Sequence, residues 1–367
     1  MPNPAVRAFS GFVFLLFAVV ASAQSAIDQL VEQSGVRPGS VAVRELPRWA
    51  GSGKIVIRDR EGVAAEIKRR HPELEVIAVA SRAEAHRHMN DAIVLVGYCA
   101  PELVAAAPDL VWAQIYSAGA ERCFTADRIR NGDVLLTNMQ KMDSPVIAEH
   151  VIAMALSLAR GLPAFAKSMD TGAWLYDSGI VAGMDSIAGK TLLVAGLGGI
   201  GTEVARRGAA LGMRVTGTRR SSREGPEFVA YVGLSDELPE LAGEADFIVN
   251  ALPLTAETEN LFDADFFASV KKGAHFINVG RGGSVVTDDL HAALKNGRIA
   301  GIGLDVTDPE PLPAGHPLWQ EANVIITPHV ASEGSNWSRK QTLLLENIAR
   351  YVQGSALYNV VDPKQGY

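Results

Sequence analysis

The stretch that decides the fold runs from residue 190 to residue 201 and reads Lys190–Thr191–Leu192–Leu193–Val194–Ala195–Gly196–Leu197–Gly198–Gly199–Ile200–Gly201. An apolar run that leads directly into the first glycine predicts a buried strand. The pattern after the last glycine predicts a helix, which Gly212 ends. A glycine-rich turn between a strand and a helix exposes backbone N–H groups to the pyrophosphate of a dinucleotide. We therefore predict a dinucleotide site at Gly196, Gly198, Gly199, Ile200 and Gly201.

Short β-rich runs alternate with helical patterns on both sides of this turn. The alternation begins at Lys54, continues to about residue 145, and resumes from Lys190 to about residue 330. Such alternation implies βαβ units and a parallel sheet in each block. We predict an α/β protein with two doubly wound parallel-sheet domains: a flavodoxin-like substrate domain over residues 53–148 and 333–367, and a Rossmann dinucleotide-binding domain over residues 149–332.

Two connecting segments are interpreted separately. Residues 24–52 have only weak helical periodicity, and we expect a linker or an extra surface element there. A long helix with Pro145 in its first turn joins the two blocks. Within this helix, Glu149–His150 is interpreted as a buried polar pair packed at the domain junction, in preference to a catalytic pair.

Composition and charge exclude several classes of function. With 48% hydrophobic and 20% charged residues, the chain is typical of soluble globular proteins. A net charge of −7 without a basic run gives no indication of nucleic-acid binding. No metal site is expected, because no residues have metal-ligand spacing. The two cysteines, Cys99 and Cys123, are expected to be free, half-buried thiols; a disulfide is the alternative if the protein is exported, since both follow predicted strand ends.

The first 23 residues have the layout of a secretory signal peptide. Arg7 precedes an unbroken apolar run, and Ala21–Ser22–Ala23 offers small residues for cleavage before Gln24. The run is too short to span a bilayer comfortably. We expect export to the periplasm, with no membrane anchor after cleavage. The alternative is a cytoplasmic protein whose start is assigned too far upstream.

Three polar residues, Arg281, Glu310 and His329, each stand at or just beyond the end of an apolar run in the second block. Because α/β proteins bind ligands at the carboxyl ends of parallel strands, we expect all three at one edge of the sheet. Arginine can hold a carboxylate through two parallel hydrogen bonds. Imidazole can both give and take a proton, and a neighbouring carboxylate favours its charged form. The set predicts proton transfer on an anionic carbonyl compound.

The strand after the glycine turn ends at Thr218–Arg219–Arg220. An NAD-specific site usually carries Asp or Glu here, bonded to the ribose 2′-hydroxyl. A carboxylate would repel a 2′-phosphate, whereas Thr218 does not, and Arg219 or Arg220 can pair with it. We predict that NADP is preferred and that NAD is a possible second cofactor. The alternative is that both arginines are ordinary solvated surface residues.

Several short motifs occur in a fixed order between Lys54 and Tyr367. They are Ser117–Ala118–Gly119, Thr137–Asn138, Ala148–Glu149–His150, the glycine turn, Ala251–Leu252–Pro253–Leu254–Thr255, Asn278–Val279–Gly280–Arg281–Gly282–Gly283, Gly303–Leu304–Asp305–Val306, Glu310–Pro311–Leu312, Pro317–Leu318–Trp319 and Thr327–Pro328–His329–Val330. By these motifs the chain resembles the D-isomer-specific 2-hydroxyacid dehydrogenases, in their glyoxylate/hydroxypyruvate reductase-like branch.

The resemblance implies an oxidoreductase that transfers a hydride between NAD(P)H and the carbonyl of a small 2-oxo acid, giving a D-2-hydroxy acid. Arg281 would hold the substrate, His329 would be the general acid or base, and Glu310 would pair with His329. Further cofactor contacts would come from Leu252, Pro253, Val279, Gly280 and Asp305, the last near the nicotinamide carboxamide. Substrate contacts from the other domain would come from Gly97, Tyr98, Ser117, Ala118 and Gly119. The resemblance also implies a homodimer.

The chain departs from the family pattern in its predicted signal peptide, since most of the family is cytoplasmic, and at two places that border the cleft. Lys141 stands where glycine is frequent, and Ala331–Ser332–Glu333–Gly334 follow His329 where Ala-Gly and a nearby Thr are usual. Both departures leave the identity of the 2-oxo acid open. One alternative is a phosphoglycerate dehydrogenase-like enzyme, which Thr218 disfavours because an acidic residue is usual there. Another is a non-catalytic, dinucleotide-dependent binding protein; a formate dehydrogenase is disfavoured because its pattern has glutamine in place of Glu310.

Overall fold

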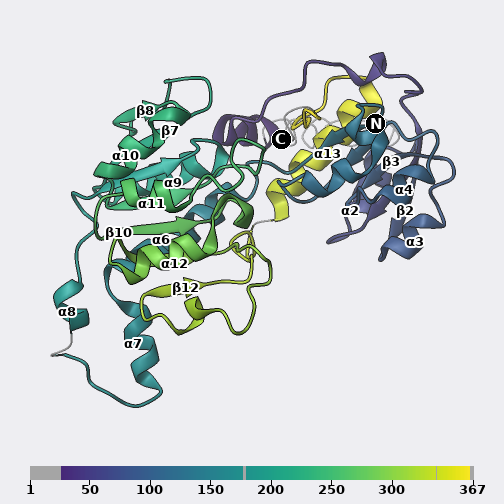
Figure 1. The fold of residues 1–367 in the computed structure, drawn as a ribbon. Coiled ribbons are helices and arrows are strands. Elements are labelled where there is room, and N and C mark those ends of the chain that lie inside the picture. Colours follow the sequence, from purple (N-terminus) through teal and green to yellow (C-terminus); the bar gives the residue numbers. More distant parts are fainter. Residues whose placement is uncertain (1–25, 177–178, 336, 364–367) are drawn as a thin grey trace, which may run out of the picture. The chain divides into compact units, whose positions relative to one another are not determined.

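The computed structural model of the protein describes residues 26–176, 179–335 and 337–363. The chain divides into two compact units (Figure 1). The first unit runs up to Met142 and resumes at Asn336, and the second is Asp143–Ser335. The predicted signal peptide, residues 1–23, lies outside the described residues.

A five-stranded parallel sheet forms the centre of the first unit. Its strand order is β2-β1-β3-β4-β5. This is the flavodoxin-like order, in which ligands bind at the carboxyl ends of the strands near the point where the order reverses, between β1 and β3. The strands are β1 (Gly53–Arg58), β2 (Leu74–Val79), β3 (Ala92–Val96), β4 (Trp112–Gln114) and β5 (Leu135–Thr137).

Alternate residues of these strands pack on two helical layers, as the pleat of a strand requires. Ile55 and Ile57 are buried with α2 and α13, which run side by side (Figure 1). Val56, between them, is buried with α3, α4 and α5. The helical elements are α2 (Val63–Arg70), α3 (Arg82–His86), α4 (Pro101–Ala105), α5 (Asp127–Arg130), α13 (Trp337–Gln353) and the 3₁₀ turns η1 (Val43–Glu45) and η2 (Glu121–Thr125).

The segment expected as a linker or surface element contributes to the core of the first unit. Residues 26–34 are helical. Ile27 and Leu30 are buried in the same cluster as α2 and α13, together with Val36 and Val43. Ile27 and Leu30 are three residues apart, so they lie on one helix face. This short apolar stripe is enough to pack the helix on the domain.

Cys99 and Cys123 form a disulfide, with their Cα atoms 5.2 Å apart. The expectation of two free thiols is therefore wrong. Cys99 follows β3 and Cys123 lies in η2, after β4, and the pairing of β3 with β4 brings these loops together. That proximity comes from tertiary structure and leaves no mark in the spacing of the two residues.

A seven-stranded parallel sheet forms the centre of the second unit. Its order is β12-β11-β10-β9-β6-β7-β8. The order reverses between β6 and β9, where a Rossmann sheet takes its dinucleotide. The strands are β6 (Thr191–Ala195), β7 (Arg214–Thr218), β8 (Tyr231–Gly233), β9 (Phe247–Asn250), β10 (Ala274–Asn278), β11 (Ile299–Leu304) and β12 (Val324–Ile326).

Helices cover both faces of this second sheet. Leu192 and Val194 of β6 are buried with α6 and α9, and Leu193 and Ala195 with α10, α11 and α12. A strand covered on both faces is apolar where it is buried, as β6 is from Leu192 to Ala195. The helical elements are α6 (Ser144–Ala159), α7 (Leu162–Met169), α8 (Gly179–Gly183), α9 (Gly199–Ala210), α10 (Leu238–Glu244), α11 (Ala264–Ser269), α12 (Thr287–Lys295) and the 3₁₀ turns η3 (Ser235–Glu237), η4 (Gly282–Ser284) and η5 (Pro317–Gln320).

The prediction of an α/β protein with two doubly wound parallel sheets is confirmed. Within the part of the chain that the structure describes, no single helix is both long and apolar enough to cross a bilayer. Helices α6 and α7, bent by 75° at their junction, meet the length and hydropathy requirements only when taken as a pair.

Candidate active site

The glycine turn connects β6 to α9 at the reversal of the second sheet. Gly196 has φ +92°, a left-handed conformation that glycine adopts without steric cost. A Cβ on Gly201 would overlap the carbonyl oxygen of Gly196 and lie 2.9 Å from Val194 Cγ1. A Cβ on Gly198 would meet nothing within 4 Å. The turn is thus packed tightly behind Gly201 and open in front of Gly198.

The N-terminus of α9 has free donors beside this open space. Gly198 is the N-cap residue and has no side chain to bond them, so the N–H groups of the first turn, which includes Gly199 and Ile200, have no partner within the helix. The helix dipole adds positive potential at the same place. These features fit the pyrophosphate of a dinucleotide.

Thr218 ends β7 beside the glycine turn. It is only 3% exposed, and its Oγ1 accepts a hydrogen bond from Gly196 N at 3.3 Å. Arg219 is half-buried and its N–H donates to the Gly233 carbonyl at 3.0 Å, whereas Arg220 is exposed. The structure therefore brings the predicted residues Thr218 to Arg220 to the rim of the cofactor site.

The opposite rim is formed by the segments after β9 and β10. Leu252 N donates to Asn250 Oδ1 at 3.1 Å, and Gly280 N donates to Asn278 Oδ1 at 3.0 Å. Pro253 follows Leu252, and Val279 N donates to the carbonyl of Asn250 at 3.1 Å. All four residues predicted to contact the cofactor here lie at the carboxyl edge of the sheet.

A buried amide network holds the backbone of Arg281. Asn250 Nδ2 donates to Asn278 Oδ1 at 2.9 Å and to Ser284 Oγ at 2.7 Å. The Arg281 carbonyl accepts hydrogen bonds from Asn278 Nδ2 at 3.0 Å and from Ser284 Oγ at 2.7 Å. Sequence reasoning missed this support, although Asn250 and Asn278 could have been noticed as polar residues that end apolar runs.

His329 and Glu310 are paired: Nδ1 of the imidazole lies 2.8 Å from Glu310 Oε1. Both side chains are about half exposed. Arg281, Glu310 and His329 follow β10, β11 and β12, which are neighbours in the sheet. The structure thus places the predicted trio along one edge, with the pairing of Glu310 and His329 that the resemblance implies.

Asp305 fixes the turn that carries His329. Its Oδ1 accepts hydrogen bonds from Thr327 Oγ1 at 2.7 Å, Val330 N at 2.9 Å and Ala331 N at 3.2 Å, and its carbonyl accepts one from His329 N at 2.8 Å. His329 itself has φ +55°, a backbone conformation that is strained for residues other than glycine. Asp305, which the resemblance places near the nicotinamide carboxamide, also anchors the backbone around His329.

Glu149 and His150 do not form the expected buried pair. The Glu149 side chain is 66% exposed and forms an ion pair with Arg207 at 3.2 Å, because it faces outward on α6. His150 is half-buried, and its Nε2 lies 3.0 Å from Thr327 Oγ1. His150 therefore contacts Thr327, whose hydroxyl bonds to Asp305. Glu149 and His150 have different environments because consecutive residues of a helix point about 100° apart.

The substrate residues predicted in the first unit gather at the carboxyl ends of β3 and β4. Gly97 has φ +87° and donates its N–H to the Gln114 carbonyl at 2.7 Å. Among the described residues, none accepts a hydrogen bond from the N–H groups of Tyr98, Ser117, Ala118 or Gly119. Because backbone donors require partners, this cluster is suited to an anion or to ordered water.

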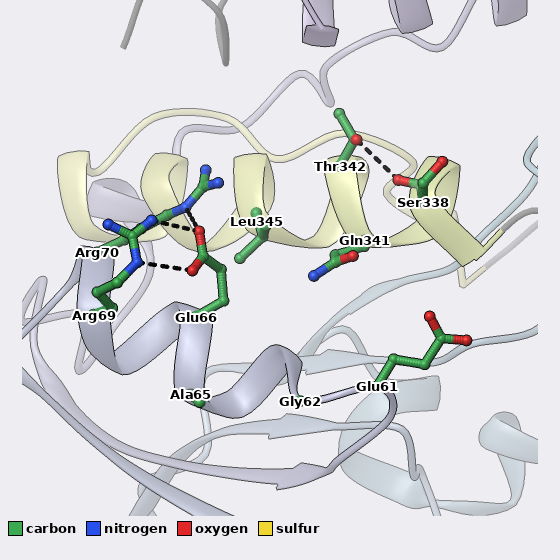
Figure 2. Close-up of a pocket in the computed structure, with 10 residues that line it drawn as sticks. All are labelled: Glu61, Gly62, Ala65, Glu66, Arg69, Arg70, Ser338, Gln341, Thr342 and Leu345. Carbon is green, nitrogen blue, oxygen red and sulfur yellow. Dashed lines mark hydrogen bonds and ion pairs between the residues drawn. The ribbon is translucent and has the colours of Figure 1, made fainter. Parts of the chain in front are cut away.

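A hollow in the first unit lies away from these residues. It is a groove of about 510 Å³ between α2 and α13 (Figure 2). Glu66 at its edge pairs with Arg69 at 2.7 Å and Arg70 at 2.6 Å, which lowers the pKa of Glu66 to about 2. No predicted site residue lines the groove. In residues 26–176, 179–335 and 337–363, no group of His, Cys, Asp or Glu is arranged to hold a metal ion.

The fold and the glycine turn define a dinucleotide-binding α/β protein, and comparison with known proteins gives its family. The sequence profile described as "D-isomer specific 2-hydroxyacid dehydrogenase, NAD binding domain" matches residues 152–331. The chain is 32% identical over 267 residues to the glyoxylate reductase of Korarchaeum cryptofilum, which covers 71% of this chain and 79% of that protein. The chain belongs to the D-isomer-specific 2-hydroxyacid dehydrogenase family.

Two further proteins are similar to this chain. The human glyoxylate reductase/hydroxypyruvate reductase is 38% identical over 203 residues, which are 54% of this chain and 61% of the human protein, so the match spans less than two thirds of that relative. The solved structure of the NADPH-dependent glyoxylate/hydroxypyruvate reductase of Sinorhizobium meliloti, in complex with NADP and sulfate, has a TM-score of 0.74 at 30% identity. That match covers 86% of this chain and 100% of the other.

Proposed function

We propose that the protein reduces small 2-oxo acids with NADPH and releases D-2-hydroxy acids. The observation that carries the proposal is the pairing of His329 Nδ1 with Glu310 at 2.8 Å on the sheet edge that also carries Arg281 and the glycine turn. A cation, a proton donor and a dinucleotide site are the parts that reduction of an anionic carbonyl compound needs. The names of the relatives point to the same chemistry.

Each polar group then has a distinct task. The Arg281 guanidinium binds the substrate carboxylate and orients the adjacent carbonyl. The ring of His329 gives a proton to the carbonyl oxygen from Nε2, because Nδ1 is engaged by Glu310. The Glu310 carboxylate holds the ring of His329 at Nδ1. Asp305 keeps the ring in place through the backbone N–H groups of His329 and Val330. A bound reduced nicotinamide supplies the hydride.

We propose that the backbone donors after β3 and β4 also bind the substrate carboxylate. The N–H groups of Tyr98, Ser117, Ala118 and Gly119 have no acceptor among the described residues. Arg58 adds positive charge beside them, since its guanidinium carbon lies 5.8 Å from the centre of the Tyr98 ring. An anion close to these groups would be stabilised by hydrogen bonds and by charge together.

The cofactor is expected to be NADP(H) in preference to NAD(H). Thr218 leaves no negative charge at the end of β7, and Arg219 and Arg220 follow it. In T218D the new carboxylate would replace a buried hydroxyl that accepts from Gly196 N. The variant should raise the KM for NADPH while leaving the KM for NADH unchanged or lower. An unchanged ratio of the two constants would mean that these residues do not set the preference.

We propose that the protein is exported, with cleavage after Ala23. The Cys99–Cys123 disulfide supports this localisation, because disulfides persist in oxidising compartments and are rare in the cytosol. N-terminal sequencing of the native protein tests the proposal. A mature chain that begins at Gln24 agrees with export, and one that begins at Met1 or Pro2 contradicts it.

We propose that the protein is a homodimer through an apolar surface on the second unit. Large side chains in and after α7 are exposed: Leu162 by 50%, Met169 by 80%, Trp174 by 93% and Tyr176 by 70%. Several exposed large apolar side chains in one segment are typical of a surface that another protein covers. Light scattering should give twice the chain mass, and W174S/Y176S should shift the protein toward the monomer.

The test of the activity is a turnover assay with the purified protein, NADPH and a panel of 2-oxo acids that includes glyoxylate, hydroxypyruvate, pyruvate and phenylpyruvate. Falling absorbance of NADPH with at least one of them, and a D-configured product, would support the proposal. Clear NADPH binding without turnover on any 2-oxo acid would contradict it and favour a dinucleotide-dependent binding protein.

A further inference from the structure

The Cys99–Cys123 disulfide joins the two loops that carry the free backbone donors of the first unit. Cys99 comes directly after Tyr98 in the loop between β3 and α4. Cys123 lies in η2, four residues after Gly119. The bridge therefore spans neighbouring loops at the carboxyl edge of the sheet, next to its reversal point.

These two loops are held very differently. The loop after β4 is tied to the segment after β5: the Ser117 carbonyl accepts from Met139 N at 2.9 Å, and the Ala118 carbonyl accepts from Asn138 Nδ2 at 2.7 Å. Ser117 Oγ also donates to the Gly119 carbonyl at 3.0 Å. The loop after β4 is therefore held by hydrogen bonds to the segment after β5 and by one within the loop itself.

The loop after β3 has few such ties. Its first residue, Gly97, donates to the Gln114 carbonyl, and the carbonyl of Ala100 at its far end accepts from Leu103 and Val104. Between these ends, no described residue forms a hydrogen bond with the backbone of Tyr98 or Cys99. This part of the loop is therefore held by side-chain packing and by the covalent bond to Cys123 instead of by backbone hydrogen bonds.

The anchor on the other side of the bridge is rigid. Cys123 is 2% exposed and packs in one core cluster with Ala120 and Ala126. Tyr98 and Cys99 pack against the same cluster. The disulfide thus links Cys99, beside the backbone donor of Tyr98, covalently to a buried core residue.

We propose that the Cys99–Cys123 bridge is a positioning element of the substrate site, which holds the N–H groups after β3 in register with those after β4 for binding of a carboxylate. This inference rests on the proposed function, in which these groups take the carboxylate of a 2-oxo acid. Opening the bridge frees the loop, and substrate binding must then order it again.

The expected signature is a change in KM without a change in kcat. The substrate carboxylate is charged before and after hydride transfer, so its contacts stabilise ground state and transition state alike, and their loss raises KM alone. If substrate binding must order about one loop residue again, the free energy of binding falls by about 1.4 kcal/mol, and KM rises about tenfold. NADPH binding, which uses the second unit, should be unchanged.

The experiment compares the oxidised protein, the same protein reduced with a phosphine, and the C99A/C123A variant. Because the chain contains two cysteines, the reductant can act only on this pair. The C99A/C123A variant is the matched control for the reductant, which should leave its kinetics unchanged. The reduced protein and the variant should show the tenfold rise in KM for the 2-oxo acid, with kcat and the KM for NADPH within about twofold of the oxidised protein. An equal KM in all three forms, or two free thiols in the protein isolated without reductant, would overturn the proposal.

Binding of an unreactive carboxylate separates this inference from the proposed activity. Oxamate affinity is measured by calorimetry on the oxidised and reduced forms in the presence of NADPH, along with their melting temperatures. A tenfold weaker affinity in the reduced form supports the positioning role even if no 2-oxo acid is turned over. A lower melting temperature with unchanged oxamate affinity overturns it, because the bridge would then be structural only.

Discussion

Replacing Gly198 with alanine should separate cofactor binding from folding. Gly198 has φ −81° and ψ −154°, a negative φ at the border of the extended region that alanine adopts, and the added Cβ would meet nothing within 4 Å. The free energy of unfolding without cofactor should therefore stay within about 1 kcal/mol of wild type, with a small gain because alanine restricts the unfolded chain.

The same methyl group should weaken NADPH binding. It would occupy the open space through which the pyrophosphate approaches the N-terminus of α9. Loss of one hydrogen bond to a charged group costs about 1.5–3 kcal/mol. We therefore expect the Kd for NADPH to rise roughly ten- to hundredfold.

Calorimetric titration with NADPH and urea unfolding of the apo protein measure the two effects. Two matched glycine variants give the controls. In G315A the new Cβ also meets nothing within 4 Å, and both measurements should equal wild type. In G201A the Cβ overlaps the Gly196 carbonyl, so stability and binding should fall together. Wild-type NADPH affinity in G198A would refute the assignment of the glycine turn as the pyrophosphate site.

Two further predictions concern the active site and the pH dependence of stability. E310Q keeps a polar partner 2.8 Å from His329 Nδ1 but removes its charge. Because both side chains are about half exposed, kcat should fall roughly ten- to hundredfold, which is less than the largest losses seen for an acid–base group. A kcat equal to wild type in steady-state assays would exclude a role for Glu310. Burial holds the pKa of His275 at about 4, below its ordinary 6.5, against the opposing attraction of Asp246 and Asp185. The ring is neutral in the folded and unfolded chain above pH 6.5, and as the pH falls toward 4 only the unfolded chain takes up the proton, so the second unit should lose about 2 kcal/mol between about pH 7.5 and pH 5. H275F keeps a ring to stack on Phe247 and should lose that much less in urea unfolding; the same loss in both proteins would contradict the assignment.

The parallel sheets and the glycine turn could be predicted because their signals are local. The apolar run of β6, the glycines that follow it and the alternation of strands and helices each lie within about 30 residues of sequence, the size of one βαβ unit. The positions of Arg281, Glu310 and His329 followed from one rule, since a residue that ends a parallel strand lies at the carboxyl edge of the sheet.

The support of the site could not be predicted, because it is made of contacts between distant parts of the chain. Asp305, after β11, accepts hydrogen bonds from Val330 and Ala331, after β12. The periodicity of the sequence does not predict that geometry. The same holds for Asn250 with Ser284 and for the pairing of Cys99 with Cys123. The outward position of Glu149 depends on the helix face that α6 buries, and both choices were compatible with its sequence.

The central claim is that His329 gives the proton in an NADPH-dependent reduction of a 2-oxo acid. The most direct test is to measure NADPH oxidation by H329A with the best 2-oxo acid of the panel, together with its Kd for NADPH. Turnover should fall by about 10²–10⁴-fold, while the Kd for NADPH stays within about twofold of wild type because His329 lies outside the glycine turn. Turnover at the wild-type rate in H329A would contradict the account.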